Sequence, residues 1–303
     1  MNKKLIAPLA RLGMVAAVAL SSGACFGCGH GSPAPPKSSA AHPAARLVLA
    51  VIGDFGCWTG SGCAEVATAQ PAEAAVARLV HSWAPDFIVS DGDNSYPDST
   101  TESRLRTNLT PFLADLAAGR FYTALGDRDW AGGDDAVALR VYGKPAHYTQ
   151  VFGSGLAAMF FADTHGGDPD GSDSTSIQAQ EFRHDLDAVQ AIWKITVNHE
   201  PQYGSGPLGS YPQYRWLTAK GVDLSIAGGH YSEHVLVNGL NYVIEGSGGE
   251  TLGEPCSKGC VDGSVWHDGT HYGALRLTVT PTSLRAEFVS IEGIVLHSFT
   301  LTK

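Results

Sequence analysis

Basic side chains are scarce in this sequence. Its 303 residues include 20 Lys and Arg against 30 Asp and Glu. Beyond residue 44, 16 basic residues face 30 acidic ones, because Lys3, Lys4, Arg11 and Lys37 all precede that point. Affinity for nucleic acid and for anionic membrane surfaces comes largely from clustered Lys and Arg. The composition therefore argues against both partners, and an anionic substrate needs a cation in its site.

The N-terminal segment lacks an apolar run long enough to cross a membrane. Its apolar run, Leu12 to Leu20, is shorter than the roughly 20 residues that a bilayer requires. A basic start precedes this run and small residues follow it, which is the pattern of a signal peptide over residues 1–24. Residues 25–45 are rich in Pro, Ala and Ser, a composition that cannot fold alone and predicts a linker.

The signal peptide predicts export from a bacterial cell, in one of two forms. Cleavage after Ala24 gives a soluble periplasmic or extracellular protein. Alternatively, Cys25 carries the lipid of a lipoprotein, because Gly23-Ala24 resembles part of a lipobox, although Ser22 stands where Leu is usual. A lipid at Cys25 is the only membrane attachment that we expect.

Cysteine is sparse and falls in two close pairs after Cys25 and Cys28. One pair is Cys57 and Cys63, and the other is Cys256 and Cys260. In an oxidising compartment this even number favours two local disulfides over a zinc site. Four cysteines allow three connectivities, so the pairing stays open.

Short apolar runs that end in Gly, Asp, Asn or His alternate with helical patterns after residue 45. The runs predict buried strands, and the alternation predicts an α/β fold with a largely parallel sheet. The expected strands are Leu47–Ile52, Phe87–Ser90, Tyr122–Leu125, Ala157–Ala162, Ile195–Val197, Leu224–Ala227 and Tyr242–Glu245. The expected helices are Ala72–Trp83, Ser103–Ala118 with a break at Pro111, and Ile177–Ile192.

The end of the chain has a different pattern. From Gly273 to Leu301, apolar residues alternate with polar ones between two turn sequences, which predicts antiparallel strands in a second sheet packed on the first. No linker or repeat interrupts the region, so residues 46–303 are expected to form one domain.

Candidate site residues stand where the predicted strands end. Loops at the carboxyl ends of strands are where open α/β sheets bind ligands. Carboxylates and imidazoles from several strands form the donor set of a divalent or trivalent metal site. The residues are Asp54, Asp93, Tyr96, Asp127, Arg128, Asn198, His199, His230 and His234.

The motifs around these residues resemble those of the calcineurin-like metallophosphoesterases, and most closely the purple acid phosphatases with their tartrate-resistant type. That family's motifs run GDxG, GDxxY, GNH(D/E), VxxH and GHxH. The chain has, in the same order, GDFG at 53–56, GDNSY at 92–96, GDRD at 126–129, ITVNHEP at 195–201 and GGHYSEH at 228–234. The resemblance covers almost all of residues 46–303 and implies a four-layer α/β/β/α sandwich of two mixed sheets flanked by helices.

The resemblance implies two metal ions, iron with iron, zinc or manganese, bridged by Asp93. One metal would take Asp54, Tyr96 and a histidine of the last motif, and the other would take Asp127, His199 and His230. The implied activity is hydrolysis of phosphate monoesters, or diesters, of small molecules by a metal-activated water. Arg128 and His199 are the candidate catalytic residues, and Arg128 and Asn198 the candidate substrate contacts.

Three departures from the family's motifs bear on this activity. Asp127 replaces a neutral Asn ligand, and Arg128 replaces a His; an arginine binds phosphate but is a poor proton donor. Ser232 replaces the second His of the last motif, so His234 could serve only if the loop bulged. If it does not, one metal is expected instead of two. A second hypothesis is therefore a catalytically silent envelope protein that keeps the fold and binds phosphate or another ligand.

Overall fold

The computed structural model describes residues 45–56, 65–66, 70–96, 101–130, 133–207 and 209–303. The chain divides into two compact units, Met1–Ala40 and Ala41–Lys303, and all described residues belong to the second. The predicted signal peptide, most of the predicted linker, Cys25, Cys57 and Cys63 lie outside the described residues. Among the described helices, none has the length and apolar character that a membrane span requires.

A six-stranded mixed sheet contains the first predicted strands. Strand β1 runs parallel to β4, and β4 runs parallel to β5, while β13 pairs antiparallel with the other edge of β1. The order is β15-β14-β13-β1-β4-β5. The bounds are Leu47–Ile52 for β1, Phe87–Ser90 for β4, Phe121–Thr123 for β5, Gly273–Val279 for β13, Ser283–Ser290 for β14 and Val295–Thr302 for β15.

The place of the last three strands differs from the prediction. We expected them to form a separate second sheet, and that was wrong, because β13 pairs along β1 with Leu49 opposite Leu277. Strand β1 is buried along its whole length, and pairing on both edges satisfies its backbone polar groups.

The second sheet has seven strands from the middle of the chain, in the order β12-β10-β11-β9-β8-β7-β6. Its central strands β7, β8, β9 and β11 are parallel to one another. Strand β6 pairs antiparallel with β7, and β10 pairs antiparallel with both β11 and β12. The bounds are Tyr148–Phe152 for β6, Ala157–Phe161 for β7, Trp193–Asn198 for β8, Leu224–Ala227 for β9, Ser232–Val237 for β10, Leu240–Glu245 for β11 and Ser264–Asp268 for β12. A short hairpin pairs β2, Glu65–Val66, with β3, Gln70–Pro71.

Helices follow the strands and carry recognisable start signals. The side chains of Thr101 and Ser176 accept hydrogen bonds from the first turns of α2 and α5. Pro111 interrupts the second helical region, as its missing N–H predicts. The α-helices are α1 Ala72–Ser82, α2 Glu102–Asn108, α3 Leu113–Ala117, α4 Ala136–Tyr142 and α5 Ile177–Ala188; the 3-10 helices are η1 Thr110–Phe112, η2 Asp127–Asp129 and η4 Pro212–Thr218.

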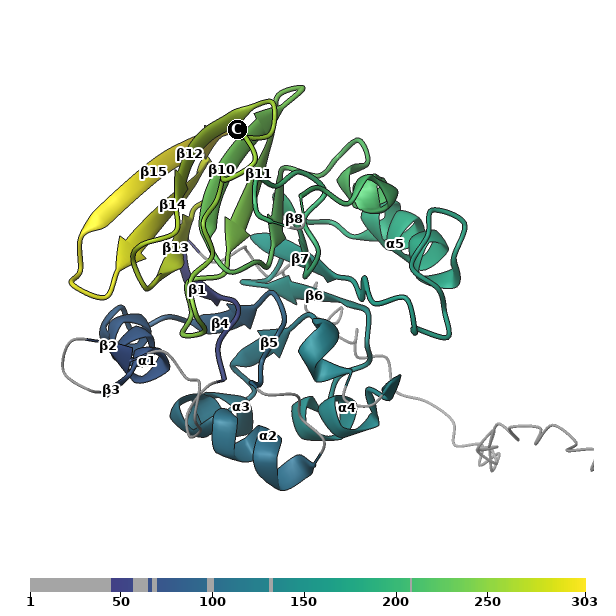
Figure 1. Cartoon of the computed structure of the whole chain (residues 1–303). Coiled ribbons are helices and arrows are strands. Elements are labelled where there is room, and N and C mark those ends of the chain that lie inside the picture. Colours follow the sequence, from purple (N-terminus) through teal and green to yellow (C-terminus); the bar gives the residue numbers. More distant parts are fainter. Residues whose placement is uncertain (1–44, 57–64, 67–69, 97–100, 131–132, 208) are drawn as a thin grey trace, which may run out of the picture. The chain divides into compact units, whose positions relative to one another are not determined.

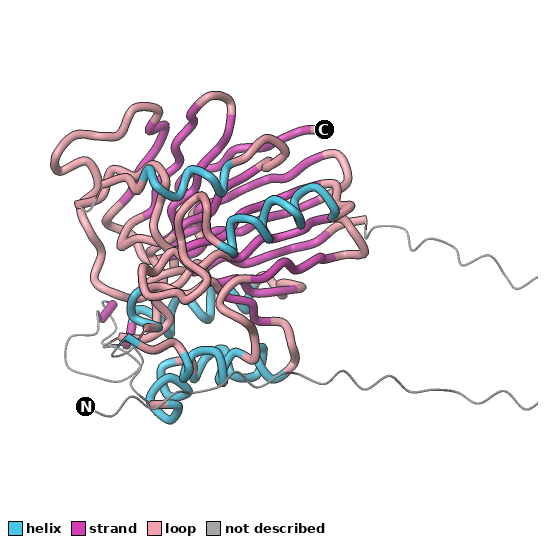
Figure 2. Tube along the Cα trace, turned by 90° about the vertical axis from the view of Figure 1, so that its right-hand side faces the viewer, coloured by secondary structure: helices cyan, strands magenta, loops and turns pink. Residues whose placement is uncertain are grey.

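Apolar side chains fill three layers of core. The facing surfaces of the two sheets meet through residues such as Leu49, Leu277 and Ile195. Helices α1, α2 and α4 cover the outer face of the six-stranded sheet, and α5 with η4 covers that of the seven-stranded sheet. The helices thus lie outside the strands (Figures 1 and 2). This confirms the predicted four-layer α/β/β/α sandwich.

A histidine pair, buried at His234 and half-buried at His297, joins the two sheets at the edge of this sandwich. His234 Nδ1 of β10 lies 2.9 Å from His297 Nε2 of β15, and its Nε2 lies 2.8 Å from Asn241 Oδ1. His234 stacks on Phe299, and His297 stacks on Trp266. Burial lowers the pKa of both histidines, and for His297 the neighbouring His234 charge lowers it further. The neutral pair is the form that this packing stabilises.

Thermal stability is expected to fall on acidification through this pair. The unfolded chain binds protons at the histidines below about pH 6.5, while the folded chain resists them, so stability is present above that pH and lost below it. The variant His297→Gln keeps a hydrogen-bonding amide but cannot titrate. We expect its melting temperature to drop less than that of the wild type between about pH 7 and about pH 5.5. Equal drops in the two proteins would contradict the assignment.

Candidate metal centre

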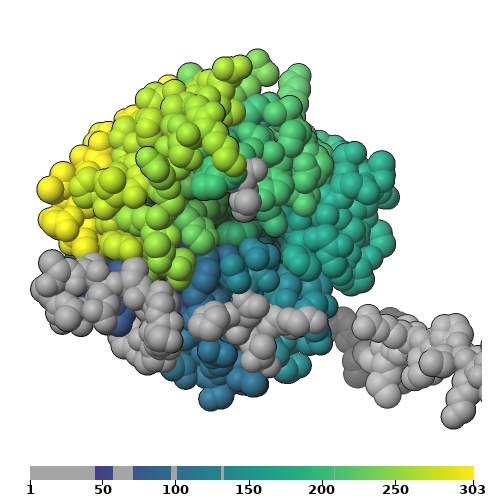
Figure 3. Space-filling model, in the orientation of Figure 1, coloured from purple at the N-terminus to yellow at the C-terminus, as the bar shows by residue number. Residues whose placement is uncertain are grey.

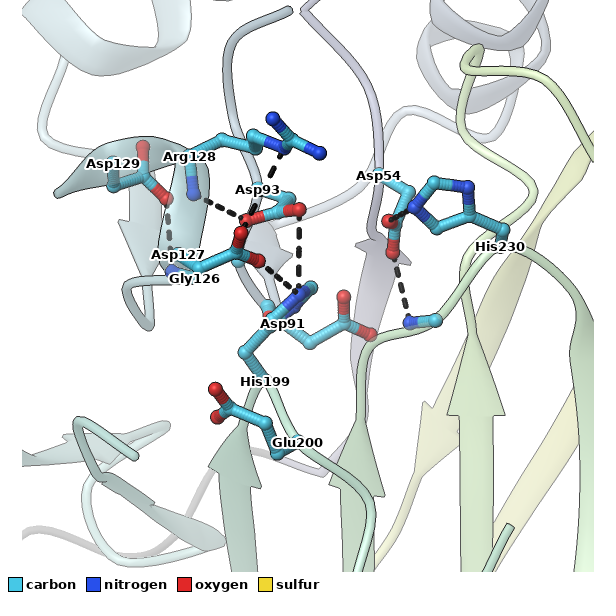
Figure 4. Close-up of polar contacts among 12 residues, drawn as sticks. Asp54, Asp91, Asp93, Gly126, Asp127, Arg128, Asp129, His199, Glu200 and His230 are labelled. Carbon is cyan, nitrogen blue, oxygen red and sulfur yellow. Dashed lines mark hydrogen bonds and ion pairs between the residues drawn. The ribbon is translucent and has the colours of Figure 1, made fainter. Parts of the chain in front are cut away.

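Two buried aspartates stand in tight turns directly after β1 and β4. Asp54 and Asp93 have φ values of 50° and 53°, the left-handed region that non-glycine residues seldom adopt. Each follows a glycine, and a Cβ on Gly53 would lie 1.8 Å from Asp91 Oδ1. The turns therefore bring the strand ends close together, and both carboxylates face the same crevice (Figure 4).

Asp54 is the centre of the first donor group. Its Oδ1 lies 3.1 Å from His230 Nε2 and accepts a 2.8 Å hydrogen bond from the Tyr96 hydroxyl, while its Oδ2 accepts one from Gly229 N. The Tyr96 hydroxyl oxygen also lies 2.7 Å from Asp93 Oδ2, so the two carboxylates share its one proton. One donor atom each from Asp54, Asp93 and His230 lies within 4.8 Å of the others. This is the spacing of ligands around one metal ion.

Asp93 links this group to a second one with Asp127 and His199. His199 Nε2 lies 3.4 Å from Asp93 Oδ2 and 3.8 Å from Asp127 Oδ1. The other ring nitrogen, Nδ1, lies 3.2 Å from the Asp91 carbonyl oxygen, a contact that fixes the orientation of the ring. These three residues also offer donor atoms within 4.8 Å of one another. The two groups share Asp93, as a bridging ligand requires.

Charge within the cluster shifts its pKa values. Burial opposes ionisation of Asp93, but His199, the Arg128 amide and Tyr96 together lower the pKa of Asp93 to about 2. The hydrogen bond to Asp54 raises the pKa of His230 to about 9. Burial and then the Asp93 charge raise the pKa of Asp127. The aspartates thus depend on protons of the histidines to balance their charge, a role that a bound cation can take over.

The donor set fits two metal ions. It combines carboxylate oxygens, imidazole nitrogens and a phenol, which are ligands for iron, zinc or manganese. The anionic residues would otherwise repel one another in a buried site, and metal ions relieve that repulsion. Asp54, His230 and Tyr96 would hold one ion, Asp127 and His199 the other, and Asp93 both.

Arg128, in the loop after β5, is the only lysine or arginine among the described residues that line the crevice. Arg128 donates its backbone N–H to Asp93 Oδ1 at 2.9 Å, and its guanidinium lies 5.6 Å from the centre of the Tyr96 ring. Its Nε lies 3.8 Å from Asp127 Oδ2. Asp129 holds this loop, because its Oδ2 accepts hydrogen bonds from Gly126 N and Asn94 Nδ2. The guanidinium is therefore placed beside both donor groups (Figure 4).

The structure corrects two expectations for the last motif. His230 lies against Asp54 instead of joining Asp127 and His199. His234 does not join the site, because strand β10 carries it into the packing between the sheets, where it contacts His297 and Phe299 even though the pairing with β12 shifts register at His234. Ser232 is also buried, and its hydroxyl donates to Glu245 Oε2 at 3.3 Å instead of facing the donor groups.

Asn198 differs from the prediction as well. It is fully buried, its Nδ2 donates to the Glu200 carbonyl at 2.7 Å, and its Oδ1 accepts from Gln202 Nε2 at 2.8 Å. Asn198 is also absent from the lining of the cavity. It shapes the turn that carries His199, so the expected direct contact with substrate is replaced by a positioning role.

A cavity of about 520 Å³ opens beside the donor groups. Its lining brings together the end of the six-stranded sheet, the segment after β8 and the loops around β10. In Figure 3 these segments, blue, green and yellow-green, meet near the centre of the view. The lining residues are Asp93, Asp127, Arg128, His199, Glu200, Pro201, Gly206, Pro207, Gly209, Tyr211, Gly228, Gly229, His230, Tyr231 and Gly253.

Two acids beside the donor groups were not predicted. Asp91 is fully buried, and neither of its carboxylate oxygens has a hydrogen-bond partner among the described residues. Burial, followed by the charges of Asp54 and Glu245, raises the pKa of Asp91 well above its usual range. Glu200 follows His199 and lines the cavity. The sequence signal that could have identified them is their position, since Asp91 directly precedes Gly92 of the second motif and Glu200 directly follows His199.

The disulfide predicted for the second cysteine pair is confirmed. Cys256 and Cys260 are joined, with their Cα atoms 4.3 Å apart. The bridge closes the loop that follows Gly253, a residue of the cavity lining.

Comparison with known proteins identifies the fold. No protein-family model and no curated protein matches the sequence. Among solved structures, the chain is similar to GAP50, titled the anchor in the inner membrane complex of Plasmodium, at 19% identity and a TM-score of 0.62 over 85% of this chain and 89% of that one. It is similar to the purple acid phosphatase PPD1 of yellow lupin at 17% identity and a TM-score of 0.62 over 86% of this chain, and spans 55% of that protein.

A third similar structure is a dimetal phosphatase of Danio rerio, at 11% identity and a TM-score of 0.53 over 86% of this chain and 99% of that one. Together with the layer order, these similarities show that the chain has the calcineurin-like metallophosphoesterase fold.

Proposed function

We propose that this chain is an exported metallophosphoesterase that hydrolyses phosphate monoesters of small molecules at a two-metal site. The observation that carries the proposal is the pair of donor groups that share Asp93, each with its atoms within 4.8 Å. The similarity in fold to a purple acid phosphatase and a dimetal phosphatase supports it.

The protein's own residues would divide the work. When bound, two metal ions lower the pKa of a water molecule and stabilise the attacking and leaving oxygens. Arg128 would bind a phosphate oxygen, because its planar guanidinium matches phosphate geometry and stays protonated. Asp93 and His199 would present their donor atoms to the metal ions in fixed positions. The Arg128 amide orients the Asp93 carboxylate, and the Asp91 carbonyl orients the His199 ring. A protonating His, as in the family's third motif, is replaced by Arg128, so esters with good leaving groups are favoured.

A silent binding protein at the cell envelope is the second candidate. Asp127, Arg128 and Ser232 all depart from the purple acid phosphatase motifs, and one of the similar structures is titled an anchor. In that case the crevice would hold phosphate or another ligand without turnover.

Metal content and turnover separate the two candidates. The purified chain is loaded with iron, zinc or manganese, and bound metal is measured with the hydrolysis of an aryl phosphate. The proposal expects close to two metal ions per chain and turnover that a chelator abolishes. Less than about half an equivalent of metal, with no hydrolysis after loading, would reject the enzyme.

A further inference from the structure

The cavity has a second wall that the metal centre does not use. This wall, here called the 200–211 wall, consists of its lining residues Glu200, Pro201, Gly206, Pro207, Gly209 and Tyr211. It begins one residue after His199 and lines the same cavity as Asp127, Arg128 and His199. A group attached to a phosphate at the metal centre would contact this wall.

The backbone of this wall offers little to an anionic or sugar-like group. Pro201 and Pro207 have no N–H, and Gly206 N is engaged with the Tyr231 hydroxyl at 2.9 Å. Among the described lining residues, Arg128 is the only lysine or arginine, and it belongs to the metal side. Lys258 Nζ, from outside the lining, donates to the Pro207 carbonyl at 3.2 Å. Among the described lining residues of this wall, a second phosphate or a carboxylate would find no positive partner.

Glu200 gives the wall a negative charge. Its backbone is held in place, because Glu200 N donates to Thr164 Oγ1 at 3.3 Å and its carbonyl accepts from Asn198 Nδ2. Its Oε2 is buried and has no hydrogen-bond partner among the described residues. Figure 4 shows the carboxylate beside His199, on the side of Asp127. An unpaired buried carboxylate is costly, and a cation beside it removes that cost.

Tyr211 adds an aromatic ring to the same wall. It lines the same cavity as Glu200. Burial, and then the Glu200 charge, raise the pKa of Tyr211. A carboxylate beside an aromatic ring is the chemistry that binds ammonium groups, through charge and through cation–π attraction.

We propose that the 200–211 wall is a subsite for an ammonium group, carried by the leaving alcohol of the phosphate monoester. This substrate class rests on the proposed phosphoesterase activity. In the reaction, the oxygen of water forms a bond to phosphorus and the bond between phosphorus and the alcohol oxygen breaks. The alcohol leaves with one proton of the water, and the phosphate keeps the oxygen of the water with its other proton.

Two esters of the same shape test the proposal on the metal-loaded chain. Phosphocholine carries a trimethylammonium group, and 3,3-dimethylbutyl phosphate has a neutral carbon in place of the nitrogen. We expect kcat/KM for the cationic ester to exceed that for the neutral one by roughly tenfold or more. In Glu200→Gln this ratio should fall towards one. Tyr211→Leu, a second variant should the first fail to fold, should also lower it.

The matched control is Glu254→Gln. It makes the same chemical change on an exposed side chain near the cavity that does not line it. The ratio should stay at the wild-type value in this variant. A ratio that falls equally in both glutamine variants would indicate the general charge of the region and overturn the subsite.

Binding of the free alcohols gives a readout that does not depend on turnover. We expect choline to raise the melting temperature of the wild type more than 3,3-dimethylbutan-1-ol does, and this difference to vanish in Glu200→Gln. A ratio near one with no preference for choline would reject the subsite while leaving the phosphoesterase intact. Selective binding of choline with no hydrolysis of either ester would reject the enzyme and the substrate class but keep the ammonium site.

Discussion

Asp93→Asn is expected to lower kcat/KM for phosphate esters by roughly 1000-fold or more and to reduce bound metal below one ion per chain. Asp93 is the one residue common to both donor groups. An amide keeps one neutral oxygen in place of two charged ones, so it cannot bridge two cations. The loss therefore reaches both metal positions, while a change at Asp54 or His199 reaches only one directly.

The choice of asparagine keeps the effect local. Asp93 has a φ of 53°, and asparagine adopts this left-handed conformation more readily than other non-glycine residues. Its side-chain oxygen can still accept the Arg128 amide or the Tyr96 hydroxyl that bind the carboxylate. The melting temperature without metal should therefore stay within a few degrees of the wild type.

Asp187→Asn is the matched control, because Asp187 lies exposed on α5, away from the donor groups. Metal content by elemental analysis and kcat/KM of an aryl phosphate should match the wild type in this control. Activity of Asp93→Asn within tenfold of the wild type would show that Asp93 is not the shared ligand of a working centre.

The strand-end residues were predictable because each stands next to an apolar run of clear length. Leu47–Ile52 is buried throughout, so the end of β1 and the position of Asp54 follow from the sequence. The same holds for Phe87–Ser90 and Leu224–Ala227, whose predicted and observed bounds agree. A strand that is buried along its whole length appears in the sequence as a continuous apolar run, so both its existence and its ends can be predicted.

Pairings between distant segments were harder to predict. The residues of Gly273–Val279 predict a strand, but they do not indicate that it pairs with β1 instead of a strand of the second sheet. Likewise, the sequence around His234 resembles a ligand loop, and only its pairing with β11 and β12 makes it a strand. Asp91 and Glu200 were missed because the chemistry of a buried acid depends on neighbours that come from other strands.

Glycine at position 246 is another feature whose role only the fold reveals. Gly246 follows β11, and a Cβ there would lie 0.8 Å from the Gly229 carbonyl oxygen and 2.9 Å from Asp54 Oδ2. The first atom belongs to the backbone, which cannot move aside as a flexible side chain does. Gly229 in turn donates its N–H to Asp54 Oδ2 at 2.8 Å and precedes His230. Close approach of two backbone segments thus holds the first donor group together.

Gly246→Ala is therefore expected to destabilise the fold by about 3 kcal/mol or more and to lower the melting temperature by roughly 6 °C or more. Any folded protein should bind metal more weakly, because Gly229 and His230 must move away from Asp54. Thermal unfolding and metal titration measure the two effects. Gly166→Ala is the control, since a Cβ there meets nothing within 4 Å, and it should melt close to the wild type. If Gly246→Ala melted with the control, the close contact between residues 229 and 246 would not exist in solution.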